Sequence, residues 1–278
     1  MNESENPLII TRHSDAYWRV TFDNPPLNLY DPEIVTGMQA LIDELERDEH
    51  VQVVVFDSAV PDFFMAHLDL RRSDEIDRSP GVTGLAPWPD FATRAARLPC
   101  VTVASIRGRA RGVGNELAMA MDVRFASKEK AVFGQLEASC GAFPGGGGLE
   151  RLHILAGRAR ALEVIVSGED YDADTAELYG FINRSIPDAE LDDFVDRFAR
   201  RVANFDRDAV AIAKRRLSEL GGVPAPADLA FTERLFFSLL ERPAAQDMVR
   251  SLFEQGLQEY GDLELNIGDR IGPAPVAA

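Results

Sequence analysis

Apolar and polar positions in the first part of the chain follow the periods of short strands and amphipathic helices. Leu8 to Thr11 and Trp18 to Phe22 predict a pair of strands joined by a polar turn. Asp31 and Pro32 then predict the start of a helix, because aspartate caps helices and proline suits their first position. The apolar residues that follow are spaced for one buried helix face: Ile34, Met38, Leu41, Ile42 and Leu45.

Three further runs have the composition of strands that are buried on both faces. They cover Val51 to Phe56, Val101 to Ser105 and Val123 to Ala126. A predicted helix at Phe91 to Leu98 separates the first two runs, and a helix around Glu116 separates the last two. Strands that alternate with helices predict parallel βαβ units, so the expected fold class is α/β.

From Arg158 onward the pattern is predominantly helical. Two apolar stripes stand out, one formed by Phe231, Leu235 and Leu239 and the other by Val249, Phe253 and Leu257. Such stripes ordinarily pack in a core, but they exceed what one short helical pair hides, so we expect association to cover part of them. We therefore divide the chain into a core (1–205), a C-terminal helical region (206–270) and a disordered tail (271–278).

Composition and charge exclude several classes of function. The 278 residues are 46% hydrophobic, which is enough for one large domain with a substantial core. A formal net charge of -17 argues against nucleic acid as a partner, because nucleic acid requires a basic surface. The N-terminal residues lack the basic region of a signal peptide, and no apolar run approaches the ~20 residues of a membrane span. We therefore expect a cytoplasmic protein without membrane association.

Cysteine and histidine contribute little candidate chemistry. Cys100 and Cys140 lie in apolar or glycine-rich surroundings, where reduced, buried thiols are common. The chain has four histidines, which are scattered without the spacing of metal ligands, so we expect no metal site.

The most informative stretch places two glutamates, Glu116 and Glu137, beside glycine-rich backbone. Gly112 to Asn115 opens an apolar helix, whose free N–H groups at its positive end can face an anion. A carboxylate beside such donors suits proton transfer next to a developing oxyanion, because the donors hold the negative oxygen while the proton moves.

Four motifs together resemble those of the crotonase (enoyl-CoA hydratase/isomerase) superfamily. Besides the segment around Glu116, residues 63–70 (FFMAHLDL) are similar to the Phe-x-Ala-Gly-Ala-Asp-Leu segment of that family. Residues 133–137 and 141–145 resemble its Phe-Gly-x-Pro-Glu and Gly-x-x-Pro-Gly motifs, and the similarity runs from Leu8 to Ile186. The resemblance implies a crotonase-like spiral of βαβ units, with C-terminal helices that assemble a homotrimer or a dimer of trimers.

The resemblance also implies an active site for an acyl-CoA thioester, with coenzyme A as part of the substrate and no separate cofactor. The backbone N–H groups of Leu68 and Val113 would form the oxyanion hole, and Glu116 and Glu137 would do the acid–base work. Substrate-binding positions carried over from the motifs are Ala66, His67, Asp69, Leu70, Arg71, Gly112 and Gly145. Two carboxyl groups favour addition of water across an α,β double bond; isomerisation, hydrolysis and a non-catalytic acyl-CoA-binding role remain alternatives.

Three residues depart from the family pattern. His67 and Val113 replace glycines, and Leu136 replaces a proline. Because a positive φ would strain valine, we expect an ordinary backbone at Val113. His67 has three possible roles: it donates to the thioester, acts as a base, or lines the cavity without taking part in the chemistry.

Coenzyme A is polyanionic, so an acidic protein needs a local basic surface to bind it. The first candidates are Arg71 and Arg72, which directly follow the first motif, and the second are Arg109 and Arg111. Trp88 lies in a loop without a signature and is expected to serve as a simple hydrophobic anchor; contact with an aromatic or bulky acyl group is the alternative.

Overall fold

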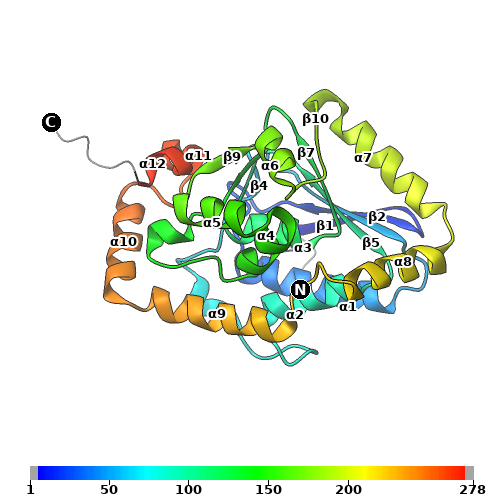
Figure 1. The fold of residues 1–278 in the computed structure, drawn as a ribbon, viewed down its shortest axis with the longest axis horizontal. Coiled ribbons are helices and arrows are strands. Elements are labelled where there is room, and N and C mark those ends of the chain that lie inside the picture. The colour runs from blue at the N-terminus through cyan, green and yellow to red at the C-terminus, as the bar shows by residue number, and fades with distance from the viewer. Residues whose placement is uncertain (1–5, 273–278) are drawn as a thin grey trace.

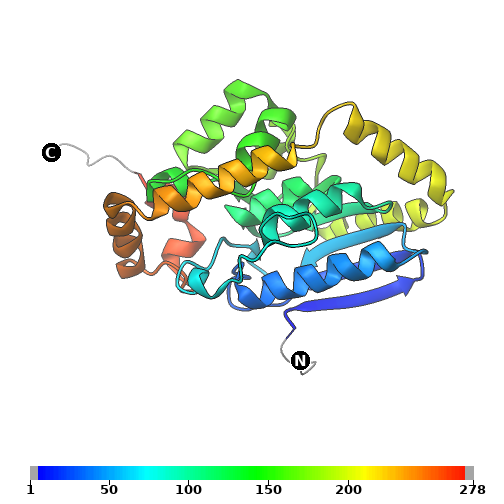
Figure 2. The same ribbon diagram turned by 90° about the horizontal axis from the view of Figure 1, so that it is seen from below.

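A computed structural model describes residues 6–272 and has two sheets surrounded by helices (Figures 1 and 2). The larger sheet has the strand order β1-β2-β3-β5-β7-β10. Only its β1–β2 pair is antiparallel, and the other strands run parallel to their neighbours. Its strands are β1 (Leu8–Ser14), β2 (Tyr17–Phe22), β3 (Val53–Ser58), β5 (Val101–Ile106), β7 (Val123–Ser127) and β10 (Arg184–Ile186). All five strands predicted from the pattern are therefore present, within a few residues of the expected bounds.

The smaller sheet gives the chain its spiral course. It has the order β4-β6-β8-β9, with β4 (Phe63–Met65), β6 (Arg109–Arg111), β8 (Val132–Gly134) and β9 (Asp170–Asp172). Each of β3, β5 and β7 in the large sheet is followed by β4, β6 or β8 in the small one, and the members of each set pair in parallel. This stacking of successive turns confirms the expected crotonase-like spiral.

Helices connect and cover the turns of the spiral. The first begins as predicted, because the Oδ1 of Asp31 accepts a hydrogen bond of 2.9 Å from the backbone N–H of Ile34. The helix predicted to start at Phe91 begins one turn earlier, at a proline. The α-helices are α1 (Pro32–Arg47), α2 (Pro87–Arg97), α3 (Val113–Ala120), α4 (Gly148–Ala156), α5 (Arg158–Ser167), α6 (Ala173–Tyr179), α7 (Asp188–Ala203), α8 (Arg207–Glu219), α9 (Pro226–Leu240), α10 (Pro243–Glu254), α11 (Asp262–Leu265) and α12 (Ile267–Arg270); two 3-10 turns are η1 (Ser73–Glu75) and η2 (Glu137–Cys140).

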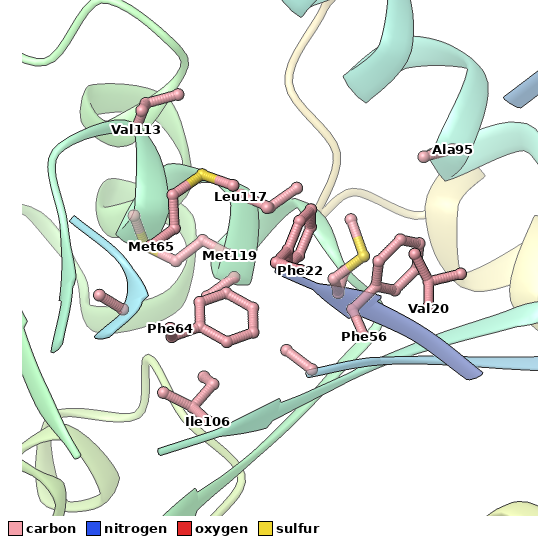
Figure 3. Packing of buried hydrophobic residues seen from close by; sticks show 14 of the residues in the cluster. Val20, Phe22, Phe56, Phe64, Met65, Ala95, Ile106, Val113, Leu117 and Met119 are labelled. Carbon is pink, nitrogen blue, oxygen red and sulfur yellow. The ribbon is translucent and has the colours of Figure 1, made fainter. Parts of the chain in front are cut away.

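The large sheet is buried on both faces, as the apolar runs predict. On one face Phe22, Phe56 and Phe64 pack with Leu117 of α3 and with α1 and α2 (Figure 3). On the other face α7 covers a second cluster that includes Phe125. The main core therefore fixes α3, which carries Glu116, against the sheet.

The two C-terminal stripes have different surroundings. The stripe on and after α10 packs within the chain, where Leu252 and Leu257 contact Leu136 and Cys140. The stripe on α9 faces outward, with Phe231 61% exposed and Leu235 40% exposed. Phe231 and Leu235 are therefore largely uncovered within the described chain, whereas Leu239 is partly buried.

Both cysteines are free and buried. No helix in the described range 6–272 is long and apolar enough to span a bilayer. The division at residues 205 and 270 stays a prediction, and residues 273–278 of the expected disordered tail lie outside the described residues.

Candidate active site

A cavity opens where the glycine-rich segments meet the C-terminal helices. One wall comes from the loop at His67 and Leu68, the start of α3 and the residues of η2. The opposite wall comes from α9, through Glu233, Phe236 and Phe237. Both predicted catalytic glutamates and both predicted oxyanion donors line this single cavity. The spiral thus gathers the motifs that the sequence spreads over some eighty positions.

The start of α3 leaves one backbone N–H group free at the cavity. Gly112, the N-cap, has φ 49° and ψ -125°, a conformation that side chains rarely adopt. The positive φ therefore falls on the glycine, and Val113 has the ordinary backbone that we expected; among residues 6–272, the only non-glycine residues with positive φ are Asn28 and Gln258. The N–H of Val113 meets no acceptor within that range.

A second free N–H group belongs to Leu68. A parallel bridge joins this residue to Tyr30: the N–H of Tyr30 donates to the carbonyl of His67 at 2.9 Å, and the N–H of Asp69 donates to the carbonyl of Tyr30 at 3.1 Å. Neighbouring N–H groups of an extended chain point to opposite sides, so this bridge directs the N–H of Leu68 away from Tyr30. It has no acceptor among the described residues.

Glu116 is buried and held by the glycine run that precedes α4. Its Oε1 accepts hydrogen bonds from the N–H groups of Gly146 at 2.7 Å and Gly148 at 2.9 Å. Burial raises the pKa of Glu116 to about 7, and the two hydrogen bonds partly oppose that rise because they favour the ionised form. The carboxyl group can therefore both take up and release a proton near neutral pH.

Glu137 begins η2 and lies across from Gly112. A Cβ atom placed on Gly112 would lie 3.0 Å from the Oε1 of Glu137, a tight contact that the carboxyl group would have to relieve by moving. With its amide nitrogen turned toward Glu137, Gln135 donates to both carboxyl oxygens, at 3.0 and 3.1 Å. Burial and the nearby charge of Glu116 raise the pKa of Glu137 well above its usual value. Because the charge of Glu116 disfavours a second negative charge beside it, the ionisation of the two carboxyl groups is linked.

The residues predicted to bind substrate fall into two groups. His67, Leu70, Gly112 and Gly145 line the cavity. Ala66, Asp69 and Arg71 do not line it. The Oδ1 of Asp69 accepts from the N–H groups of Arg71 at 2.9 Å and Arg72 at 3.2 Å, which shapes the loop after the first motif.

The four candidate arginines differ in how strongly their guanidinium groups are already paired with groups of the protein. Arg111 is buried and pairs with Asp170, with a nitrogen–oxygen distance of 2.5 Å, which removes it from the candidates for a phosphate. Arg109 donates to the carbonyl of Leu265 at 2.7 Å. Arg72 forms ion pairs with Glu33 at 2.7 Å and Glu75 at 2.9 Å. Arg71 is half exposed, with a single 3.2 Å ion pair to Glu259 and its guanidinium 4.9 Å from the centre of the Phe253 ring, and is the best remaining candidate.

The imidazole of His67 faces two acceptors. Its Nε2 lies 2.9 Å from the Oε1 of Glu264, and its Nδ1 lies 3.0 Å from the carbonyl oxygen of Leu68. Burial lowers the pKa of His67, but the charge and hydrogen bond of Glu264 outweigh burial, and the net pKa is raised. With a proton on each nitrogen, the ring has no lone pair to act as a base.

Three polar residues of the cavity were missed by the sequence analysis. Tyr30 and Glu233 line it together with Arg78, whose guanidinium lies 3.7 Å from the centre of the Phe237 ring. Burial raises the pKa of Glu233 to about 7. Glu233 belongs to a helix predicted only from its apolar stripe, so its polar face carried no signal. Trp88, expected to be a hydrophobic anchor, also donates from Nε1 to the carbonyl of Gly146 at 2.7 Å.

Comparison with known proteins agrees with this fold. The sequence matches the enoyl-CoA hydratase/isomerase family over residues 12–262. A Rhizobium meliloti protein named a probable enoyl-CoA hydratase is 32% identical over 79% of this chain and 84% of its own. A solved structure of a candidate enoyl-CoA hydratase from Streptomyces avermitilis is 39% identical, with a TM-score of 0.92 over 99% of this chain and 100% of that one. An enoyl-CoA hydratase structure from Geobacillus kaustophilus is 28% identical, with a TM-score of 0.72 over 90% and 94% of the two chains.

The chain therefore belongs to the enoyl-CoA hydratase/isomerase family. That membership implies an acyl-CoA thioester as the substrate class. No group of three or more His, Cys, Asp or Glu side chains within residues 6–272 is arranged to hold a metal ion.

Proposed function

We propose that this protein is an enoyl-CoA hydratase, which adds water across the α,β double bond of an acyl-CoA thioester. The observation that carries the proposal is the meeting of Glu116 and Glu137 with the free N–H groups of Leu68 and Val113 around one cavity. Hydration requires one group to take a proton from water and another to give a proton to Cα. Two carboxyl groups with raised pKa values, Glu116 buried and Glu137 partly buried, meet that requirement.

The local contacts favour a division of labour between the glutamates. The two hydrogen bonds that Glu116 accepts from backbone N–H groups favour its ionised form. We therefore assign Glu116 as the base that takes a proton from water while the water oxygen bonds to Cβ. The π electrons move through Cα toward the thioester oxygen, which Leu68 and Val113 stabilise. Glu137 then delivers its proton to Cα, and the product is a 3-hydroxyacyl thioester. Each backbone donor contributes about 2.7–4 kcal/mol to transition-state stabilisation.

Replacing either glutamate tests the proposal most directly. Glu116→Gln and Glu137→Gln preserve side-chain size but remove the titratable carboxyl group, so each is expected to lower turnover of a short enoyl-CoA by at least ~100-fold. Turnover is followed as loss of the absorbance of the conjugated thioester. Glu190→Gln is the matched control, because Glu190 is exposed on α7 and does not line the cavity. Wild-type turnover in either site variant would remove that glutamate from the mechanism.

Isomerisation is the second candidate. One oxygen of Glu116 is already held by two N–H groups, which would leave Glu137 as a single base that shuttles a proton between Cα and Cγ. An isomerase given a 3-enoyl thioester would increase the conjugated absorbance, whereas a hydratase given a 2-enoyl thioester decreases it. The faster of these two reactions assigns the activity.

Self-association is part of the proposal. Besides the α9 stripe, α8 exposes Ile212 (54%) and Leu217 (68%), and such apolar surface is normally covered. We infer that these helices meet other copies in a homotrimer or a dimer of trimers. Light scattering is expected to report three or six chains per particle, and Phe231→Glu combined with Leu235→Glu is expected to reduce that number. A monomer at micromolar concentration would contradict the assembly without affecting the proposed chemistry.

A further inference from the structure

Each nitrogen of the buried His67 ring faces one oxygen atom, from the carboxyl group of Glu264 or the carbonyl group of Leu68. Besides His67 Nε2, the Oε1 of Glu264 accepts the backbone N–H of Gln258 at 2.6 Å, which favours an ionised carboxylate. The carbonyl of Leu68 has no proton to give to Nδ1. Two acceptors at the two ring nitrogens are both satisfied only when each nitrogen carries a proton, as in an imidazolium.

The contacts of Gln258 extend this link between the C-terminal segment and the loop of the first motif. Its side-chain Nε2 donates to the Oδ1 of Asp69 at 3.0 Å, and its backbone has φ 64°. Glu264 itself is fully buried, and its carbonyl oxygen accepts from Arg111 at 2.6 Å. Residues 258–264 are thus fixed on one side to the small sheet and on the other to His67 and Asp69.

The charges around the ring come in pairs. Glu264 balances His67, and Asp170 balances Arg111, which lies close enough to oppose protonation of the ring. The second oxygen of Glu264 is buried without a hydrogen-bond partner in the described chain. Loss of the imidazolium would therefore leave a buried carboxylate without its main counter-charge.

We propose that His67 is a positioning residue, held as an imidazolium by Glu264, which fixes the loop that presents the Leu68 N–H to the thioester oxygen. The inference rests on the proposed function, since Leu68 is there an oxyanion donor. The C-terminal segment then takes part in alignment of the oxyanion hole although it touches no reacting atom. A shift of a donor by about 1 Å can cost ~100-fold in rate, so the alignment affects kcat.

Nitrogen NMR of the histidine rings in the full-length protein tests the protonation state directly. Both ring nitrogens of His67 are expected to resonate at protonated positions at pH 7.5, above the unperturbed histidine pKa of ~6.5. The signals are assigned by their loss in His67→Gln. A neutral ring at that pH would overturn the proposal, whether or not the protein hydrates enoyl thioesters.

Kinetics test the positioning role. His67→Gln and Glu264→Gln are each expected to lower kcat by about 10- to 100-fold while KM changes much less, because the loop still forms but the donor is displaced. The double variant is expected to be no worse than either single one, since both break the same link. Glu254→Gln, on the exposed side of α10, is the control and is expected to keep wild-type kcat.

The outcomes separate the two hypotheses. Wild-type kcat in soluble His67→Gln, with an active parent protein, would overturn the positioning role and leave the hydratase proposal standing. If Glu264→Gln fails to fold, His67→Gln and the wild-type spectrum still decide. No turnover in the wild-type protein, together with a protonated His67, would overturn the hydratase proposal and with it the catalytic part of this inference, while the ion pair itself would stand.

Discussion

The two walls of the cavity differ in what holds them. The wall that carries Glu116 is tied by short hydrogen bonds between distant segments, such as those from Gly146 and Gly148. The wall that α9 provides is largely apolar and contacts the cavity through Phe236 and Phe237. Hydrogen-bonded walls fix atoms to within a fraction of an ångström, whereas apolar walls set shape and tolerate adjustment. We therefore expect changes in the first wall to affect kcat and changes in the second to affect KM.

Two neighbouring glycines give the sharpest form of this comparison. A Cβ on Gly146 would lie 2.3 Å from both the Oε2 of Glu116 and the Nε1 of Trp88, while a Cβ on Gly145 would lie 2.5 Å from the Phe236 ring. Gly146→Ala is expected to lower kcat by about 100-fold, because it displaces the carboxylate. Gly145→Ala is expected mainly to raise KM, because α9 must move. Equal effects of the two variants on kcat, measured by steady-state kinetics, would contradict the difference between the walls.

The two glutamates of the first wall determine how the rate changes with pH. With Glu116 as the base and a pKa of about 7, the rate is expected to fall up to tenfold per pH unit as acid protonates this group. At the alkaline side the rate falls when Glu137 loses its proton, because the acid is then gone. The residual activity of Glu116→Gln is expected to lack the acid limb. An unchanged acid limb in that variant would assign it to another group.

Glu233 tests the second wall. Because its pKa is about 7, Glu233 becomes ionised above neutral pH. Binding of an apolar acyl chain then desolvates this carboxylate, which weakens the binding. KM for a plain enoyl-CoA is expected to rise several-fold between pH 6.5 and 8.5 in the wild-type protein but not in Glu233→Gln. The value of kcat should be nearly the same in both. A kcat loss as large as that of Glu116→Gln would place Glu233 in the reaction itself.

The smallest effect is expected at Trp88. Trp88→Phe removes the hydrogen bond to the carbonyl of Gly146, but the Nη1 of Arg151 still donates to that oxygen at 3.0 Å. The expected loss is about 1 kcal/mol, or a fall of roughly 2–4 °C in Tm, with little change in kcat. Calorimetry of the variant measures it. A kcat loss near that of Gly146→Ala would show that the indole holds the glycine run in place.

The features that could be predicted from the sequence are those set by residues close together in the chain. The strands of the large sheet follow from apolar runs, and α1 follows from the cap at Asp31, because each signal lies within a few positions of the element it sets. The gathering of Glu116 and Glu137 at one cavity was expected from motif resemblance. Their catalytic roles remain predictions.

Pairings between distant residues were not predictable in this way. Glu264 meets His67 across 197 positions, and no local pattern marks either as the partner of the other. Arg111 was considered for a phosphate because its sequence surroundings are basic, whereas in the fold it faces Asp170, 59 positions away. In both cases the spiral stacking of the turns determines the neighbour.

The hydrogen bonds of Glu116 also connect catalysis with local unfolding. Gly148 is the first residue of α4, so the side chain of Glu116 is a hydrogen-bond acceptor for the N-terminal turn of that helix, about thirty positions away. If α4 opens while the sheet stays folded, Glu116 returns to water and its pKa falls toward that of an ordinary glutamate. A partly opened molecule would then keep most of its secondary structure but lose turnover. On heating, loss of activity should therefore precede the loss of the far-ultraviolet signal, and the enzyme would report the opening of one helix before global unfolding.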